Sequence, residues 1–387
     1  MKAVKISDDI YWVGAIDWDL RNFHGYLTQR GSSYNAYLIL DENITLIDNV
    51  KSHLYNEMMD RITEIVDPSL IRYHISNHVE MDHSGCLPQL MELTPKATVV
   101  TSPNGEKGLR AHYRKDWDFK VVQSGETINL GKHALQFFLT RMVHWPDNMV
   151  SYCPQKNILF SNDAFGQHLA TSERFDDEYL FNVQMEEAKK YYANIVLPYS
   201  MQVKQALDAV SPLNIKLIAP SHGLMWRSFI PEITEEYQKW SSNATERKAL
   251  IIYDTMWKST EKIAHEIGKV FQQKGYLYRL LNLQTNHISD IMTELITASH
   301  ICVGSPTLNN NMLPSVAAFL TYLKGLAPRD RVALAFGSYG WGGQGVDLVE
   351  KSLQESKFEL LDKIKVQYIP DEQTLKQISE KLEQAID

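Results

Sequence analysis

From residue 248 onward, short apolar runs alternate regularly with amphipathic segments, and this alternation constrains the fold more than any other feature of the chain. Continuous apolar runs such as ALIIYD (residues 249–254) are typical of parallel strands that are buried on both faces of a sheet. Amphipathic segments such as STEKIAHEIGKVFQQKG (residues 259–275) have the spacing of helices that cover such a sheet. The series predicts a doubly wound α/β domain over residues 248–387.

Residues 1–247 have a different sequence pattern, in which many short strand-like runs are separated by turns and helical patterns. The runs IRYHIS and ATVVT and the hairpin-like MVSYCPQKNILFSND are examples. Such a mixture predicts a sandwich of sheets covered by helices. The polar stretch QKWSSNATER at residues 238–247 is typical of a linker. We therefore expect two domains, residues 1–247 and 248–387.

Composition excludes several classes of protein. Lys plus Arg is 39 and Asp plus Glu is 47, so the net charge is -8, and no basic stretch offers a footprint for nucleic acid. The three cysteines are far apart, which predicts no disulfide framework and fits a reducing compartment. No apolar run is long enough to span a membrane, and the N-terminus lacks the apolar region of a secretory signal. We expect a cytoplasmic protein.

The run NHVEMDHSG at residues 77–85 carries four potential metal ligands close together. His78 and Glu80 are two residues apart, so in an extended backbone they point the same way. Asp82 and His83 follow in the turn. Clustered imidazoles and carboxylates are costly to fold unless a cation offsets them, so the run favours a metal site over a solvated polar turn.

Three further candidate ligands stand just past apolar runs, where side chains leave a sheet and can converge: His144, Asp163 and His222. With the four ligands of residues 77–85 they make seven, too many for one tetrahedral zinc ion. Seven ligands suffice for two five- or six-coordinate ions that share a bridge.

Three loops of the second half have the composition of a flavin site. Residues 254–260 (DTMWKST) lead from the first apolar run directly into a helix, whose N-terminus is an anion site, although Ser259 or Thr260 could simply cap that helix. SPTLNN (305–310) and SYGWGG (338–343) follow two other predicted parallel strands. No G-x-G-x-x-G follows the first strand, so FMN is favoured over NAD. The predicted FMN contacts are Thr255, Met256, Trp257, Lys258, Ser259, Thr260, Pro306, Thr307, Leu308, Asn309, Asn310, Ser338, Tyr339, Gly340, Trp341 and Gly342.

The run from His78 to His83, followed by the three later ligands, resembles the metal site of the metallo-β-lactamase fold. It departs from the zinc hydrolases at Glu80, which stands where those enzymes carry a second histidine. A hard oxygen donor in place of imidazole shifts the preference from zinc towards iron. Together with the flavodoxin-like half, essentially the whole chain resembles the flavodiiron proteins, or A-type flavoproteins. The resemblance implies an α/β protein: a metallo-β-lactamase-like αββα sandwich followed by a flavodoxin-like doubly wound parallel sheet.

The resemblance also assigns roles to residues. It implies that one iron is held by His78, Glu80 and His144, the other by Asp82, His83 and His222, and that Asp163 bridges them. Members of the family differ in whether the histidine at the position of His83 coordinates. The segment FHGY at residues 23–26 matches a family motif, which would place His24 beside the pocket for the diatomic substrate with a part in catalysis. The alternative for His24 is a histidine satisfied within its loop.

By the same resemblance, the chain would reduce O2 to water or NO to N2O at a non-haem diiron site fed by FMN. A separate rubredoxin or a reduced deazaflavin would supply electrons, because no rubredoxin-like CxxC pair follows the flavodoxin-like half. A head-to-tail homodimer, or a dimer of such dimers, would bring one chain's flavin beside the other chain's irons. Two alternatives are a zinc hydrolase with a flavodoxin-like appendage, which Glu80 opposes, and an FMN carrier with a vestigial metal site, which the seven ligands oppose.

Overall fold

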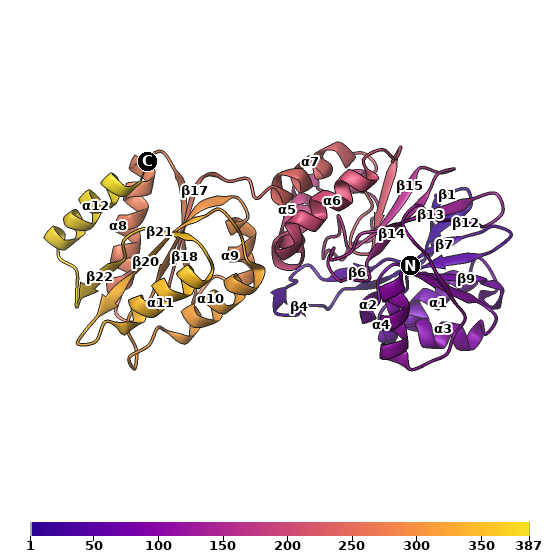
Figure 1. The fold of residues 1–387 in the computed structure, drawn as a ribbon, viewed down its shortest axis with the longest axis horizontal. Helices are drawn as coiled ribbons and strands as arrows, with labels where there is room; N and C mark the ends of the chain where they lie inside the picture. The colour runs from indigo at the N-terminus through magenta and orange to yellow at the C-terminus, as the bar shows by residue number, and fades with distance from the viewer. Residues whose placement is uncertain (1, 387) are drawn as a thin grey trace. The chain divides into compact units, whose positions relative to one another are not determined.

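The structure is a computed structural model that describes residues 2–386, and it divides into two compact units. The first unit comprises Met1–His24, Thr28–Tyr191 and Tyr199–Gln238. The second comprises Gly25–Leu27, Tyr192–Pro198 and Lys239–Asp387. Figure 1 shows the ribbon of both units with their helices and strands labelled.

Two sheets form the centre of the first unit. The seven-stranded sheet has the order β1 (Val4–Ser7), β2 (Ile10–Trp12), β7 (Tyr37–Ile39), β8 (Thr45–Ile47), β9 (Tyr73–Ser76), β10 (Thr98–Thr101) and β11 (Phe119–Val121). The five-stranded sheet has the order β12 (Thr127–Asn129), β13 (Ala134–Leu139), β14 (Met149–Cys153), β15 (Ile158–Asn162) and β16 (Leu217–Pro220). The expected hairpin is present as the antiparallel pair β14–β15, and β15 pairs with β16 in parallel.

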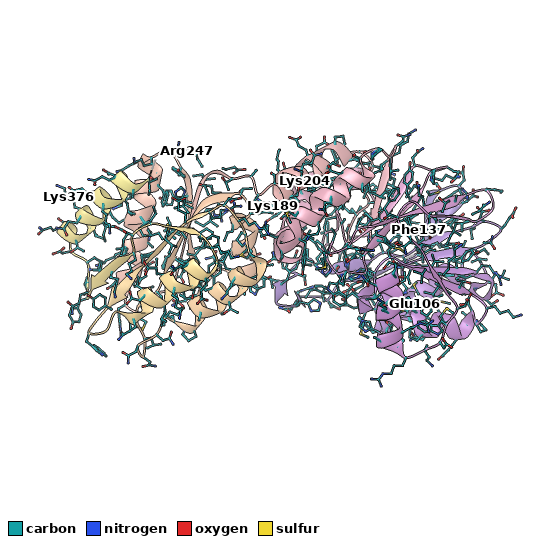
Figure 2. The ribbon with its side chains drawn as sticks, in the orientation of Figure 1. Glu106, Phe137, Lys189, Lys204, Arg247 and Lys376 are labelled. Carbon is teal, nitrogen blue, oxygen red and sulfur yellow. The ribbon has the colours of Figure 1, made fainter. Side chains whose placement is uncertain are left out.

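The two sheets of the first unit pack face to face. Residues of β9 and β10, such as Ile75 and Val100, share one buried cluster with Phe137 and Phe160 of β13 and β15. Along β13 the buried and half-buried side chains alternate, as expected for a strand with one face in the core, and Phe137 is labelled in Figure 2. This inner cluster is the core between the sheets.

Helices cover the outer faces of both sheets. Met58 and Ile62 of α1 (Tyr55–Thr63) and Leu90 of α3 (Leu87–Leu93) share a cluster with residues of β7 and β8. Val210 of α6 (Ser200–Val210) packs on residues of β14 and β15. The layers run helix, sheet, sheet, helix, so the predicted αββα sandwich is confirmed.

Further elements complete the first unit or occur where the chain passes between the units. In chain order they are β3 (Ala15–Asp17), β4 (Asn22–Phe23), β6 (Ser32–Tyr34), η1 (Ser52–Leu54), η2 (Pro68–Leu70), α2 (Met81–Ser84), α4 (Pro103–Tyr113), η3 (Asp176–Glu178), α5 (Phe181–Tyr191), η4 (Tyr192–Val196), η5 (Leu197–Tyr199) and α7 (Ile230–Ser241). Three of the helical segments occur where the chain passes between the units: η4 belongs to the second unit, whereas η5 and α7 each have residues in both. Among residues 2–386, none of the helices has the length and apolarity needed to cross a bilayer.

The second unit is built on one parallel sheet. Its main path has the order β18 (Leu277–Asn282), β17 (Glu246–Tyr253), β19 (Ala298–Gly304), β20 (Val332–Tyr339) and β21 (Glu359–Leu360), and β22 (Ile364–Gln367) also pairs with β20. Every one of these pairings is parallel. The helices are α8 (Ser259–Gln273), α9 (Ile288–Leu295), α10 (Pro314–Leu326), α11 (Gln344–Glu355) and α12 (Glu372–Ala385), and β5 (Tyr26–Leu27) also belongs to this unit.

Helices lie on both faces of this sheet. Ile263 and Ile267 of α8 share a buried cluster with Ile378 and Leu382 of α12 and with residues of β17. Figure 1 shows α10 and α11 side by side along the other face. Because the chain starts in the interior of the sheet at β17 and moves outward in both directions, the sheet is doubly wound, as the sequence predicts.

Candidate metal centre and flavin site

Four of the predicted metal ligands lie at the carboxyl end of β9. His78 and Glu80 lie in the segment between β9 and α2, whereas Asp82 and His83 lie in the single turn of α2. Gly85 follows this turn, and a side chain there would approach the carbonyl oxygen of Met81 to 2.3 Å. Only glycine therefore allows the chain to turn away so tightly after the ligands.

The other three ligands come from the second sheet of the first unit. His144 lies in the loop between β13 and β14, Asp163 directly follows β15, and His222 follows β16. Since β15 and β16 are parallel neighbours, their carboxyl ends bring Asp163 and His222 to the same edge. The expectation that residues just past the strand ends converge is met.

The carboxylate of Asp163 faces two pairs of imidazoles. Its Oδ2 lies 3.7 Å from Nε2 of His78 and 3.4 Å from Nε2 of His144. Its Oδ1 lies 3.0 Å from Nε2 of His83 and 3.4 Å from Nε2 of His222. One oxygen towards each pair is the arrangement that a carboxylate needs to bridge two metal ions.

The ligand atoms form two groups. His78, His144 and Asp163 make the first group, and in each group the ligand atoms lie within 4.8 Å of one another. The second group is Asp82, His83 and His222. Glu80 completes the first group, because its Oε2 lies 3.4 Å from Nε2 of His78 and 3.3 Å from Nε2 of His144. The structure thus brings all seven predicted ligands together.

The site is buried, and many of its polar atoms lack a hydrogen bond of normal geometry within the described residues. These atoms are Nε2 of His78, both side-chain nitrogens of His83 and all the carboxylate oxygens of Asp82 and Asp163. A buried polar atom without a partner costs about 1–3 kcal/mol, so this cluster calls for cations. Imidazoles mixed with carboxylates are a donor set that iron accepts, and the residues therefore fit a diiron centre.

The acid–base properties of the cluster show the same need for positive charge. Burial alone would lower the pKa of His78, but the hydrogen bond to Asp147 and the nearby carboxylate of Glu80 outweigh it and raise the pKa to about 10. Burial is likewise outweighed at His144, where Asp163 and Glu80 raise the pKa to about 10. The carboxylates thus favour positive charge on the groups beside them, and this is the charge that bound metal ions would supply.

Asp147 was not predicted from the sequence, yet it orients a predicted ligand. Its Oδ2 accepts hydrogen bonds from Nδ1 of His78 at 2.9 Å and from the backbone N–H of Val79 at 2.8 Å. This leaves Nε2 of His78 to face the metal site. The available signal was the run HWPD, which places a carboxylate three residues after His144. On the opposite side, Nδ1 of His222 donates to the carbonyl of Ser33 at 2.8 Å.

Replacing Asp147 with asparagine is expected to lower iron affinity by about 10- to 100-fold, because the amide orients His78 less firmly and adds no negative charge. Iron per chain after dialysis against a graded chelator measures the effect. Asp116→Asn is the control, since that side chain is 97% exposed and belongs to the same unit. Equal iron retention in the two variants would contradict the orienting role.

His24 lies beside the cluster. Its Nε2 lies 3.0 Å from Oε1 of Glu80, and its own side chain is 71% exposed. Both residues line a pocket of about 360 Å³ that also includes Lys51 and Asp82. The structure therefore places His24 in the wall of this pocket, in contact with a proposed ligand, and its part in catalysis stays a prediction.

The predicted flavin loops meet at one end of the sheet in the second unit. Residues 255–260 follow β17, residues 306–310 follow β19, and residues 338–342 include the end of β20. Oγ1 of Thr260 lies 3.0 Å from Oγ of Ser338, and the N–H of Thr307 donates to the carbonyl of Ser338 at 3.1 Å. The loops thus form one continuous surface.

This surface offers hydroxyls and aromatic rings for a ligand. Within the described residues, the buried Oγ1 of Thr255 has no hydrogen-bond partner. Trp257 is 89% exposed and Trp341 is 94% exposed, so two indoles project from two of the loops. Such groups suit a phosphate at the start of α8 and a flat ring, and the residues fit FMN.

Comparison with known proteins places the chain in a family. Residues 33–223 match the family described as "ODP family beta lactamase", and residues 251–381 match the flavodoxin family. The nitric oxide reductase of Moorella thermoacetica is 44% identical over 365 residues, which cover 93% of this chain and 92% of that protein. The rubredoxin-oxygen oxidoreductase of Megalodesulfovibrio gigas is 40% identical over 397 residues, covering 100% and 98%.

The solved structures agree. The crystal structure of the flavodiiron protein from Giardia intestinalis is 34% identical, covers 99% of this chain and 96% of that one, and superposes with a TM-score of 0.96. This chain belongs to the flavodiiron protein family. It is an oxidoreductase whose cofactors are FMN and a non-haem diiron centre, and the zinc hydrolase alternative is not favoured.

Proposed function

We propose that this protein reduces O2 to water, NO to N2O, or both, at a diiron centre in residues 1–247 that receives electrons from FMN in residues 248–387. The observation that carries the proposal is the carboxylate of Asp163, which turns one oxygen towards each of two ligand groups. The relatives named as a nitric oxide reductase and a rubredoxin-oxygen oxidoreductase support both substrates.

Bound iron would supply open coordination positions for a diatomic gas and a path for its electrons. His78, Glu80 and His144 would hold one ion, Asp82, His83 and His222 the other, and Asp163 would bridge them. Asp147 and the carbonyl of Ser33 keep the imidazoles of His78 and His222 directed inward. Five of the seven proposed ligands are buried, namely His78, Asp82, His83, Asp163 and His222, and this burial strengthens the electrostatic interactions within the site.

Both reductions consume protons, and His24 would help to deliver them to the site. Its Nε2 lies within hydrogen-bond distance of Glu80 and its ring is exposed in the pocket, so it can exchange a proton with solvent there. In the second unit, the start of α8 would bind the FMN phosphate. Trp257 and Trp341 would flank the flavin ring.

The proposed partners follow from the family. The electron donor is a rubredoxin or a reduced deazaflavin, and the protein acts in the cytoplasm. The chain assembles as a head-to-tail homodimer or a dimer of such dimers, which brings each flavin beside the irons of the other chain. Light scattering on the FMN- and iron-loaded protein tests the assembly, and a monomer with full reductase turnover would refute it.

The experiment that tests the activity is turnover of the loaded protein with reduced rubredoxin in oxygen-free buffer, to which a known amount of O2 or NO is added. We expect consumption of O2 or NO that depends on both FMN and iron, with N2O as the product from NO. Protein with FMN but without iron is the control, because it should oxidise rubredoxin only slowly. Equal gas consumption with and without iron would refute the proposal and favour a plain flavin carrier.

A further inference from the structure

A small apolar cavity lies in the first unit between α6 and the strands β14 and β15. Its volume is about 20 Å³. Its walls are mainly aliphatic: Val143, Val150, Leu159, Val203, Leu207 and Val210. Side chains of α6 form one wall of this partly open space, and side chains of the sheet form the opposite wall. No step of the function proposed above uses this space.

Besides the hydroxyl of Thr140, two polar groups lie in the cavity wall, and both form hydrogen bonds to the backbone. The hydroxyl of Ser161 donates to the carbonyl of Ala164 at 2.8 Å, and the hydroxyl of Tyr237 accepts from the N–H of Phe165 at 2.7 Å. A buried water needs two to four polar partners, and a cavity of this size holds about one small molecule. The cavity therefore suits a small apolar molecule better than water.

The cavity reaches the segments that carry two proposed metal ligands. Val143 directly precedes His144, and Ala164 directly follows Asp163; both line the cavity. Adjacent α-carbons are at most about 3.8 Å apart, so the cavity wall and the metal site share the same two short stretches of backbone. A molecule in the cavity would therefore contact residues that are bonded directly to two of the proposed ligands.

The cavity also adjoins the solvent. A surface groove of about 500 Å³, lined by polar residues such as Gln123, Arg141 and Gln205, shares Thr140 and Ala206 with the cavity. Ala206 is half-buried on α6, so a small side chain stands where the groove and the cavity meet. The groove and the cavity therefore adjoin at Thr140 and Ala206, and the cavity wall in turn includes the neighbours of two proposed ligands.

We propose that this cavity binds a small apolar gas molecule and supplies it to the metal centre. The inference rests on the proposed function for the identity of the gas as O2 or NO, whereas binding itself requires only an apolar diatomic. The pocket lined by His24, Lys51 and Glu80 carries charged side chains, which suit protons and water. Gas and protons would then enter by separate routes.

Xenon tests the binding site without reference to activity, because it occupies dry apolar cavities. Crystals of the FMN- and iron-loaded protein under xenon pressure should show xenon between α6 and β14. Ala206→Phe should abolish that site, because the ring fills the space where cavity and groove meet. Ala209→Phe is the matched control, because Ala209 is exposed on the same helix and lines the groove but not the cavity.

A second variant covers the case in which Ala206→Phe folds poorly. Val203→Ala removes two methyl groups from the cavity wall and should raise xenon occupancy. Absence of xenon from both the unmodified protein and Val203→Ala would overturn the proposal. So would xenon binding that is the same in Ala206→Phe and Ala209→Phe.

Steady-state kinetics link the site to the reaction. Ala206→Phe should raise the KM for the gas severalfold and leave kcat at saturating gas unchanged, while Ala209→Phe should change neither. Unchanged KM in Ala206→Phe despite loss of xenon would overturn the supply role. Xenon in the cavity of a protein that consumes no gas would refute the proposed function, while the gas-binding site itself would stand.

Discussion

Replacing Asp163 with alanine is expected to lower gas reduction at least about 100-fold, more than the loss typical of a residue that only orients a ligand. The reason is that its two oxygens are the only described carboxylate atoms that face both ligand groups. Without them, His78 and His144 are no longer joined to His83 and His222 through one carboxylate. Iron content and turnover of the purified variant measure the effect.

Asp208→Ala is the control for Asp163→Ala, because Asp208 is an exposed carboxylate of α6 in the same unit. It should keep full iron and full activity. Circular dichroism should show that both variants are folded and that the loss at Asp163 is local. Full gas reduction by the Asp163 variant would mean that the cluster is not the catalytic centre.

Replacing Ser259 with aspartate is expected to weaken FMN binding by more than about 100-fold, because opposing like charges costs several kcal/mol. Ser259 is the first residue of α8 and is buried. A carboxylate there would stand against the FMN phosphate at the helix start. Fluorescence titration of the flavin-free protein with FMN measures the change in Kd.

Two further variants show how much of the loss of FMN affinity comes from the charge introduced at Ser259. Ser259→Ala removes one hydroxyl and should cost only a few-fold in affinity, the value of a single hydrogen bond. Ser242→Asp introduces the same charge at an exposed serine of the second unit and should leave FMN binding unchanged. If Ser259→Asp also bound FMN normally, the phosphate would have to bind elsewhere.

The sequence predicted the fold and the ligand set because both depend on local patterns. Buried parallel strands appear as continuous apolar runs, so β17, β19 and β20 and the loops after them were identifiable. The run from His78 to His83 is contiguous, and Asp163 directly follows a strand. Resemblance to a known family then assigned the ligands to two ions.

Other features depend on contacts that no local pattern encodes. Asp147 orients His78 across 69 residues of sequence, and an isolated Asp after a Pro indicates only a turn. Gly25–Leu27 and Tyr192–Pro198 cluster with the second unit although they lie within residues 1–247, the range predicted for the first domain. The apolar cavity exists only because α6 packs on β14 and β15, so it follows from packing rather than from any motif.

The most direct test of a diiron flavoprotein is the content of iron, zinc and FMN per chain in protein produced in iron-replete cells. The ligand set built around Asp163 and the three loops of the second unit predict close to two irons and one FMN per chain. Two zincs, or a chain without flavin, would contradict the account.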